Sequence, residues 1–162
     1  MSSFAKILGG TVLGAGLIAG VNYLKNIRRA KAELEIIPTA NLYSLTWDGI
    51  TVRVDVLIKN PTSGSFLIKF PFVKLIYKST TIGSSQALNK NIKIAAHGEA
   101  KIDKILITVP VTSVFSLVFG LIKALHNKEA IKLTIKTMTE VDIGFAKIPY
   151  DNETEVVLKK PN

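Results

Sequence analysis

Apolar and polar residues alternate along much of the chain, most clearly in the segment VDVLIKNPTSGSFLIKF, residues 54–70. Between residues 51 and 58 the apolar positions recur with a period of two, which is typical of a half-buried β-strand. They are Val52, Val54, Val56 and Ile58. Similar alternation occurs in the segments 73–77, 92–94, 105–109, 131–135 and 141–145. Turn-forming residues separate these segments at 60–64, 79–85, 87–91 and 95–99, so we predict an all-β fold, an antiparallel β-sandwich.

Two of these segments change the parity of their apolar positions. Ile102 and the next apolar residue of the pattern, Ile105, are three residues apart instead of two, and so are Phe145 and Ile148. A shift of one residue moves every following side chain to the other face of a strand. We therefore expect β-bulges or bends at both places.

The segment TSVFSLVFGLIKALHN breaks the alternation, because its polar and small residues recur every three or four positions. These residues are Ser113, Ser116, Gly120, Lys123 and Asn127. The spacing predicts one helix over about residues 112–126, with Thr112 or Ser113 capping its start. The helix is more apolar than a one-sided surface helix requires. It should either cap an open end of the sandwich or lie against a membrane or a partner.

The chain begins with an apolar segment, ILGGTVLGAGLIAGVNYL, residues 7–24, which carries no charged side chain. As an N-terminal hydrophobic helix it would be about 27 Å long, enough to span a bilayer. Five glycines are spread along it: Gly9, Gly10, Gly14, Gly16 and Gly20. Their spacing leaves a surface of small residues on which another helix could pack closely. We expect either a single-pass membrane anchor or a helix that packs against copies of itself or against other helices in a larger assembly.

A basic cluster follows the apolar segment. It consists of Lys25, Arg28, Arg29 and Lys31. If residues 7–24 cross a membrane, this cluster places the following domain on the cytoplasmic side. The strongest charge cluster lies after the apolar segment, so a secretory signal fits less well. We predict two parts: residues 1–31, the helix with its basic flank, and residues 32–162, the β-sandwich.

The expected partners are membrane lipid or other protein subunits, bound through the N-terminal helix, and a homo-oligomer is one option. The chain has 21 lysines and arginines against 12 acidic residues, a net charge of +9, which suits an acidic partner. Only Arg28, Arg29 and Arg53 are arginines. Specific recognition of nucleic acid usually relies on the arginine fork, so we do not expect it here.

Residue types that carry catalysis or bind metals are sparse. The chain has no cysteine, and His97 and His126 stand alone in a predicted turn and at a predicted helix end. No nucleophile motif or phosphate-binding glycine loop is present. Glu153 and Glu155 share the outer face of a predicted strand, and Trp47 beside a turn is expected to cover the core. We therefore predict no enzymatic activity, no catalytic residues, no cofactor and no metal site.

Two longer segments, ITVRVDVLIKNPTSGSFLIKFPFVKLIYKSTTIGSS and IKIAAHGEAKIDKILITVPVT, resemble the type 2 late embryogenesis abundant domain. This family is also called the water stress and hypersensitive response (WHy) domain, and the resemblance covers about residues 33–158. The matching features are a strand that ends in Asn60-Pro61, the step from Ser79 to Gly83, and the segment Val109–Val111. Proline cannot donate to a strand ladder, so Pro61 also ends the strand on physical grounds.

The resemblance implies a fibronectin-III-like sandwich of two antiparallel sheets with one helix at residues 112–127. It also implies a protective role toward proteins or membranes during desiccation, without family-wide catalytic residues, and many members carry an N-terminal membrane segment. The first functional hypothesis is thus a non-catalytic, membrane-anchored binding or protective domain. The alternative is a structural subunit of a large assembly such as a virion, with the N-terminal helix packed in a protein bundle.

Overall fold

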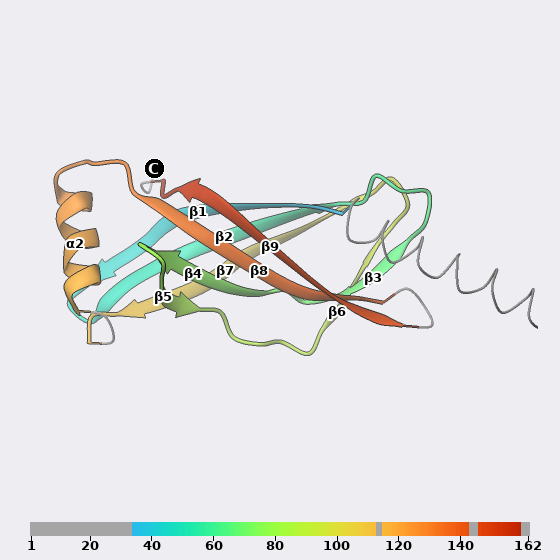
Figure 1. Ribbon diagram of the computed structural model, residues 1–162, viewed down its shortest axis with the longest axis horizontal. Helices are drawn as coiled ribbons and strands as arrows, with labels where there is room; N and C mark the ends of the chain where they lie inside the picture. The colour runs from blue at the N-terminus through green and yellow to red at the C-terminus, as the bar shows by residue number, and fades with distance from the viewer. Residues whose placement is uncertain (1–33, 113–114, 143–145, 160–162) are drawn as a thin grey trace, which may run out of the picture. The chain divides into compact units, whose positions relative to one another are not determined.

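The computed structural model describes residues 34–112, 115–142 and 146–159 (Figure 1). The order of elements is β1 (Glu35–Thr46), β2 (Gly49–Lys59), β3 (Phe66–Lys69), β4 (Phe72–Tyr77), β5 (Thr80–Ser84), β6 (Asn91–Ile94), β7 (Glu99–Pro110), α2 (Phe115–His126), β8 (Lys132–Asp142) and β9 (Lys147–Val157). Within these residues the chain is mostly strand with one helix, which confirms the predicted all-β class. The N-terminal hydrophobic helix and the division at residues 31 and 32 lie outside the described residues.

The strands form two antiparallel sheets. One has three strands in the order β1-β2-β7, and the other has the order β5-β4-β8-β3-β6, with β9 on the opposite side of β8. Strand β8 organises the larger sheet, because it pairs with β9 along its whole length. On its other side it pairs first with β4 and then with β3.

The two sheets are joined along both of their sides. On one side the chain after β9 pairs with β1: the amide of Leu42 donates to the carbonyl of Lys159 at 2.8 Å, and the amide of Lys159 donates to the carbonyl of Ala40 at 3.1 Å. On the other side β5 lies against β7, where an added Cβ at Gly83 would stand 2.9 Å from Cγ2 of Ile107. The sheets therefore form a nearly closed β body around one core.

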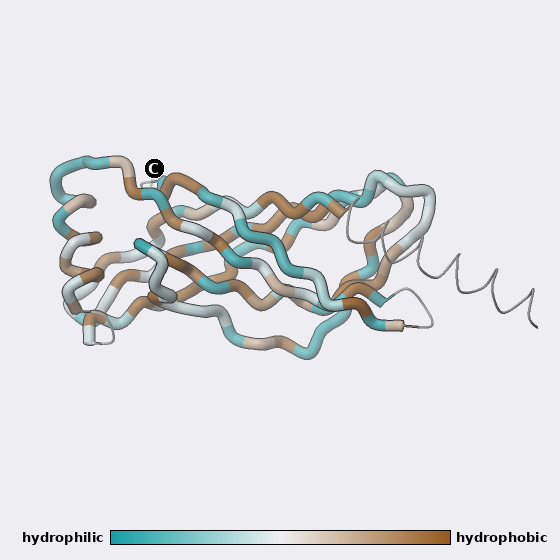
Figure 2. The backbone as a smooth tube through the Cα atoms, in the orientation of Figure 1, coloured by the Kyte–Doolittle hydropathy of each residue, from teal (hydrophilic) through white to brown (hydrophobic). Residues whose placement is uncertain are grey.

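The core follows the alternation seen in the sequence. In β2 the side chains of Val52, Val54, Val56 and Ile58 are at most 1% exposed, as predicted. The inner faces of β4, β7 and β8 add further fully buried residues, among them Val73, Leu75, Ile107, Val109, Leu133 and Ile135. Figure 2 shows the resulting alternation of hydrophobic and hydrophilic residues along the strands. Burial of these aliphatic side chains is the main driving force for folding.

The first predicted parity change is a β-bulge. The register between β2 and β7 shifts between Val54, which faces Ile105, and Val56, which faces Ile102. Asp103 and Lys104 of β7 thus lie opposite the single residue Asp55 of β2, and Lys104 has a φ of 60°. The second change, near Phe145, has a different cause, because Val141 pairs with Ile148 across the β8–β9 hairpin. The chain reverses there, and Phe145 itself lies outside the described residues.

Three strands differ from the sequence prediction. Alternation did not give the extent of strand β1, of which only the end near Trp47 was expected, because Pro38 interrupts its pattern. Proline is tolerated there because β1 is at the edge of its sheet. The predicted turn 79–85 is wrong for most of its length, since only Lys78 and Ser79 turn, both with positive φ, and Thr80–Ser84 is strand β5. Strand β8 is continuous, although two separate segments were predicted. The prediction missed the middle of the strand because its inward residues there, Thr137 and Thr139, are polar.

The predicted helix is α2, which ends at His126 as expected. Ser113, a candidate cap, lies outside the described residues. Figure 1 shows α2 across one end of the two sheets, and its side chains Val118 and Leu121 are buried. The helix therefore caps an end of the sandwich, which was the first of its two predicted roles.

Candidate functional site

The site residues proposed from the sequence lie outside the described residues. They are Gly9, Gly10, Gly14, Gly16 and Gly20 on the N-terminal segment and the basic residues Lys25, Arg28, Arg29 and Lys31. Among the residues that the structure describes, no helix has both the length and the apolar character needed to cross a membrane.

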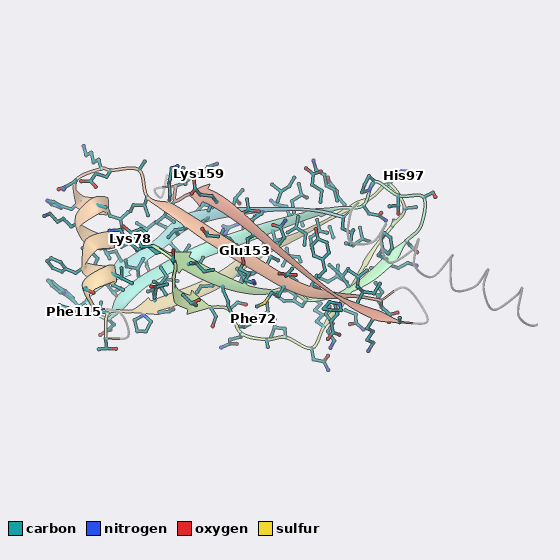
Figure 3. The ribbon with its side chains drawn as sticks, viewed as in Figure 1. Phe72, Lys78, His97, Phe115, Glu153 and Lys159 are labelled. Atoms are coloured by element: carbon teal, nitrogen blue, oxygen red, sulfur yellow. The ribbon has the colours of Figure 1, made fainter. Side chains whose placement is uncertain are left out.

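The two histidines lie far apart in the fold. His97 is exposed in the turn between β6 and β7, and its backbone amide donates to the carbonyl of Thr62 at 2.9 Å. His126 is exposed at the C-terminus of α2. Figure 3 shows that this helix, marked by Phe115, and His97 lie at opposite ends of the sandwich. Within residues 34–112, 115–142 and 146–159, no three His, Cys, Asp or Glu side chains are grouped in a way that could hold a metal ion.

Asn60 is 1% exposed, and its side-chain amide is hydrogen-bonded through both its nitrogen and its oxygen. Its Nδ2 donates to the carbonyl oxygens of Gly64 at 2.7 Å and Ala95 at 2.8 Å. Its Oδ1 accepts from the amide of Thr62 at 3.0 Å and from the Thr62 hydroxyl at 2.7 Å. The backbone amide of Asn60 also donates to the carbonyl of Gly98. We call this arrangement the Asn60 lock, since it ties the loop after β2 to the turn before β7.

The lock explains why asparagine precedes Pro61 here. A buried amide needs partners for both of its donors and for its acceptor, and the two loops supply them all. An aliphatic side chain of similar size would leave backbone carbonyls unpaired at the same place. The Asn-Pro step therefore serves the architecture of this end of the sandwich.

A second polar cluster stabilises the β-bulge of β7. Asp55 Oδ1 accepts from the backbone amide of Lys104 at 2.8 Å and from Nε of Arg53 at 2.9 Å. Burial tends to raise the pKa of Asp55, but these hydrogen bonds and the charge of Arg53 outweigh it and leave the pKa below its usual value. The carboxylate thus binds the backbone amide of Lys104 in the bulge, so its role is structural.

Other buried polar side chains also serve the backbone. The Ser85 hydroxyl accepts from the amide of Val73 at 2.9 Å, and the Thr139 hydroxyl donates to the carbonyl of Lys69 at 2.6 Å. Thr137 is fully buried, and its hydroxyl has no hydrogen-bond partner in the described part of the chain. None of these groups combines a nucleophile with a base.

The outer face of β9 carries acidic residues that pair with lysines of β8. Glu153 lies 2.7 Å from Nζ of Lys136, and Glu155 lies 2.9 Å from Nζ of Lys132. Hydrogen bonding to Glu153 raises the pKa of Lys136. Glu153 and Glu155 share this exposed face, as predicted, and such charges discourage edge-to-edge pairing of strands.

A surface hollow of about 600 Å³ lies where β3 gives way to β4. Apolar side chains line it, notably Phe70, Phe72, Leu88 and Met138. The Lys69–Glu140 ion pair, 2.9 Å long, belongs to the same lining. Glu140 and Lys69 are the acidic and basic side chains of this lining, and they are paired with each other.

Exposed aromatic residues gather at the end of the sandwich that carries α2. Trp47 is 100% exposed, Phe115 is 65% exposed, and Phe119 is 61% exposed. The rings of Phe115 and Phe119 are stacked with their centroids 6.2 Å apart. The expectation that Trp47 covers the core is therefore wrong, because the turn between β1 and β2 carries its indole out into solvent. We call these three residues the aromatic end; the periodicity of the sequence could not separate them from core residues.

Comparison with known proteins gives a likeness at the level of fold. No family model and no curated protein matches the chain. The solution structure of an Arabidopsis thaliana protein has a TM-score of 0.51 at 18% identity, with 82% of this chain and 85% of that chain covered. A crystal structure of an Archaeoglobus fulgidus protein has a TM-score of 0.46 at 11% identity, covering 78% of this chain and 98% of that chain. A solution structure of a candidate late embryogenesis abundant protein has a TM-score of 0.39 at 18% identity, covering 98% and 91%. Since the last two scores lie below 0.5, only the first likeness is informative, and it shows a shared fold.

Proposed function

We propose that this chain is a non-catalytic, membrane-anchored binding or protective domain of the type 2 late embryogenesis abundant kind, with a fibronectin-III-like sandwich. The observation that carries the proposal is the role of the residues on which the sequence resemblance rests. Asn60 locks two loops, Gly83 lets β5 approach β7, and Pro110 ends β7 before the turn into α2. Each of them maintains the architecture, and none is placed for chemistry.

The buried polar groups support a binding role rather than catalysis. Asn60, Ser85 and Thr139 are bonded to backbone groups, and Asp55 caps a bulge. A catalytic site instead needs polar groups that converge on a space where a substrate can lie. In this proposal the β-sandwich is a stable scaffold. Its function is to bind partners through its surface and through the N-terminal segment.

Membrane attachment in this proposal rests on the sequence of residues 7–24 and the basic cluster that follows. The full-length protein should sediment with membranes, resist extraction by alkaline carbonate and dissolve in detergent. A reporter fused after residue 31 should lie on the cytoplasmic side. Recovery of the full-length chain as a soluble monomer without detergent would contradict the anchor.

The protective role needs its own measurement. Dye-loaded vesicles carrying the full-length protein should leak less after drying and rehydration than vesicles that carry a single-pass control protein at equal mass. Equal leakage from the two preparations would leave the anchor in place but contradict protection.

The second candidate is a structural subunit of a large assembly such as a virion. The small-residue surface formed by Gly9, Gly16 and Gly20 favours it, since such surfaces allow close packing of helices. Mass photometry of the detergent-extracted protein separates the two hypotheses. Discrete oligomers that disappear in the variant Gly16→Leu would support the assembly, whereas monomers alone would support the anchor.

A further inference from the structure

Helix α2 has more apolar surface than the sandwich covers. Of its 12 residues only Ser116, Lys123 and His126 are polar. The core takes up Val118 and Leu121, whereas Phe115 and Phe119 stand out on the exposed side. Large exposed aromatic rings cost solubility, so a pair of them at one place marks a surface that is normally covered.

The turn between β1 and β2 brings Trp47 to the same end. The amide of Val111, four residues before Phe115, donates to the carbonyl of Asp48 at 3.2 Å, and Gly49 pairs with Pro110. Figure 1 shows this turn beside α2, and Figure 3 shows Phe115 projecting from the same end. The aromatic end is thus built from two elements that the fold holds together.

Charge favours a lipid surface as the occupant over a second copy of the chain. Helix α2 carries Lys123 and His126 and no acidic residue. Lys78 and Lys132 line the same surface hollow as Ala124 of the helix, Lys128 follows the helix, and the acidic residues at this end are Asp48, Glu129 and Glu155. Residues 32–162 carry 16 lysines and arginines and 12 acidic residues, a net charge of +4, so two copies of the domain repel each other, whereas an anionic bilayer attracts it.

We propose that the aromatic end is a lipid-contacting surface, which places Trp47, Phe115 and Phe119 in the headgroup region of an anionic bilayer. Tryptophan and phenylalanine beside basic residues are the side chains that interfacial membrane-binding segments use. The basic side chains at the C-terminal part of α2 can extend outward to the lipid phosphates while the three rings lie deeper in the headgroup region.

This contact lies at the opposite end of the sandwich from the start of the β domain. Strand β1 runs from Glu35 to Thr46, just before Trp47, and a strand of that length measures roughly 40 Å. The aromatic end therefore lies about one strand length away from Glu35, where the β domain begins.

Trp47 provides the test, because it is the single tryptophan of the chain and its fluorescence reports this end alone. Full-length protein is reconstituted in neutral phosphatidylcholine vesicles and mixed with acceptor vesicles that contain phosphatidylserine and brominated phosphatidylcholine. We expect the Trp47 emission to shift to shorter wavelength and to be quenched by the acceptor vesicles. Raising the salt concentration should weaken the quenching.

The variant F115S/F119S should lower the apparent affinity for the acceptor vesicles by roughly tenfold or more, because it removes the apolar area that enters the bilayer. The matched control is Leu88→Ser, which changes a leucine that is 48% exposed in the loop between β5 and β6. The control should bind like the wild type. Far-UV circular dichroism of each variant checks that the fold is retained.

The outcomes distinguish this proposal from the N-terminal anchor. If the protein does not stay in the donor vesicles, the anchor fails, yet Trp47 quenching by acceptor vesicles still tests the aromatic end with free protein. Bromine placed only in the donor vesicles tells whether the end contacts the same membrane instead. Absence of quenching in both arrangements would overturn the proposal, and so would lipid-free dimers that F115S/F119S abolishes.

Discussion

Replacement of Asn60 by aspartate is the sharpest perturbation of the Asn60 lock. The substitution changes only the amide nitrogen into an oxygen, so the volume of the side chain is preserved. That nitrogen donates to the carbonyl oxygens of Gly64 and Ala95 at 2.7 and 2.8 Å. In Asn60→Asp both hydrogen bonds are lost, and an anionic oxygen faces two carbonyl oxygens at a site that is 1% exposed.

The expected loss of stability follows from these contacts. Each hydrogen bond contributes about 1 kcal/mol net, and burial of a charge without a partner adds a further penalty of a few kcal/mol. We expect Asn60→Asp to lower the free energy of unfolding by about 3 to 5 kcal/mol at pH 7. A domain of this size is stable by only about 5 to 15 kcal/mol, so the effect is large.

The pH dependence of the variant gives a second check. Burial and the two carbonyl oxygens should raise the pKa of the new carboxyl group in the folded state above its ordinary value of about 4. The folded state then binds the proton more tightly than the unfolded state. The variant should therefore regain stability as the pH falls through the folded-state pKa toward about 4, and lose it as the pH rises.

The assay is urea unfolding of the full-length protein in mild detergent, followed by far-UV circular dichroism at pH 7 and pH 5. Trp47 is fully exposed, so its emission is a poor probe of unfolding. The matched control is Asn89→Asp, the same change at an exposed loop position, which should shift stability by less than about 0.5 kcal/mol. Equal urea midpoints for Asn60→Asp and the wild type at pH 7 would refute the role assigned to the lock.

Three further predictions concern the contact between β5 and β7, the buried Thr137 and the bulge of β7. Gly83→Ala should destabilise the fold by about 1 to 3 kcal/mol, because the new methyl group would lie 2.9 Å from a methyl group of β7. Gly120→Ala in α2, where an added methyl group would have no atom within 4 Å, should stabilise it by about 0.5 to 1 kcal/mol. Thermal denaturation of the two variants tests these opposite signs. Thr137→Val should be neutral or stabilising by up to about 1 kcal/mol in the same assay, since the buried hydroxyl has no partner among the described residues; clear destabilisation would disprove this. Asp55→Asn should flatten the pH dependence of stability in acid. The lowered pKa of Asp55 stabilises the fold above about pH 4, and this contribution is lost as the pH falls through the folded-state pKa. Urea midpoints at pH 7, 4 and 3 that change equally in the variant and the wild type would count against this role.

The sequence was most informative where one face of a strand is purely aliphatic. The period of two in β2 predicted its buried residues, and the break in parity after Ile102 located the bulge of β7. It was weakest where the inward residues are polar. Thr137 and Thr139 of β8 face the core of the sandwich, so the sequence pattern predicted two short strands in place of one long strand.

Strands β1 and β5 show a related limit. Pro38 in β1 and Gly83 in β5 are ordinary signals of a strand end or a turn. In the fold, β1 lies at a sheet edge that tolerates proline, and glycine is needed where β5 approaches Ile107. Neither fact is visible before the two sheets are brought together.

The sequence by itself determined the all-β class, the position of α2 and the aliphatic face of each principal strand, because these depend on local periodicity and on the burial of apolar side chains. It also determined the apolar character and basic flank of residues 1–31. Only the tertiary structure decided the partners of Asn60 and the exposure of Trp47, Phe115 and Phe119. Such properties depend on contacts between segments far apart in the chain: the same aromatic side chain fills a core or faces solvent according to what the fold packs against it.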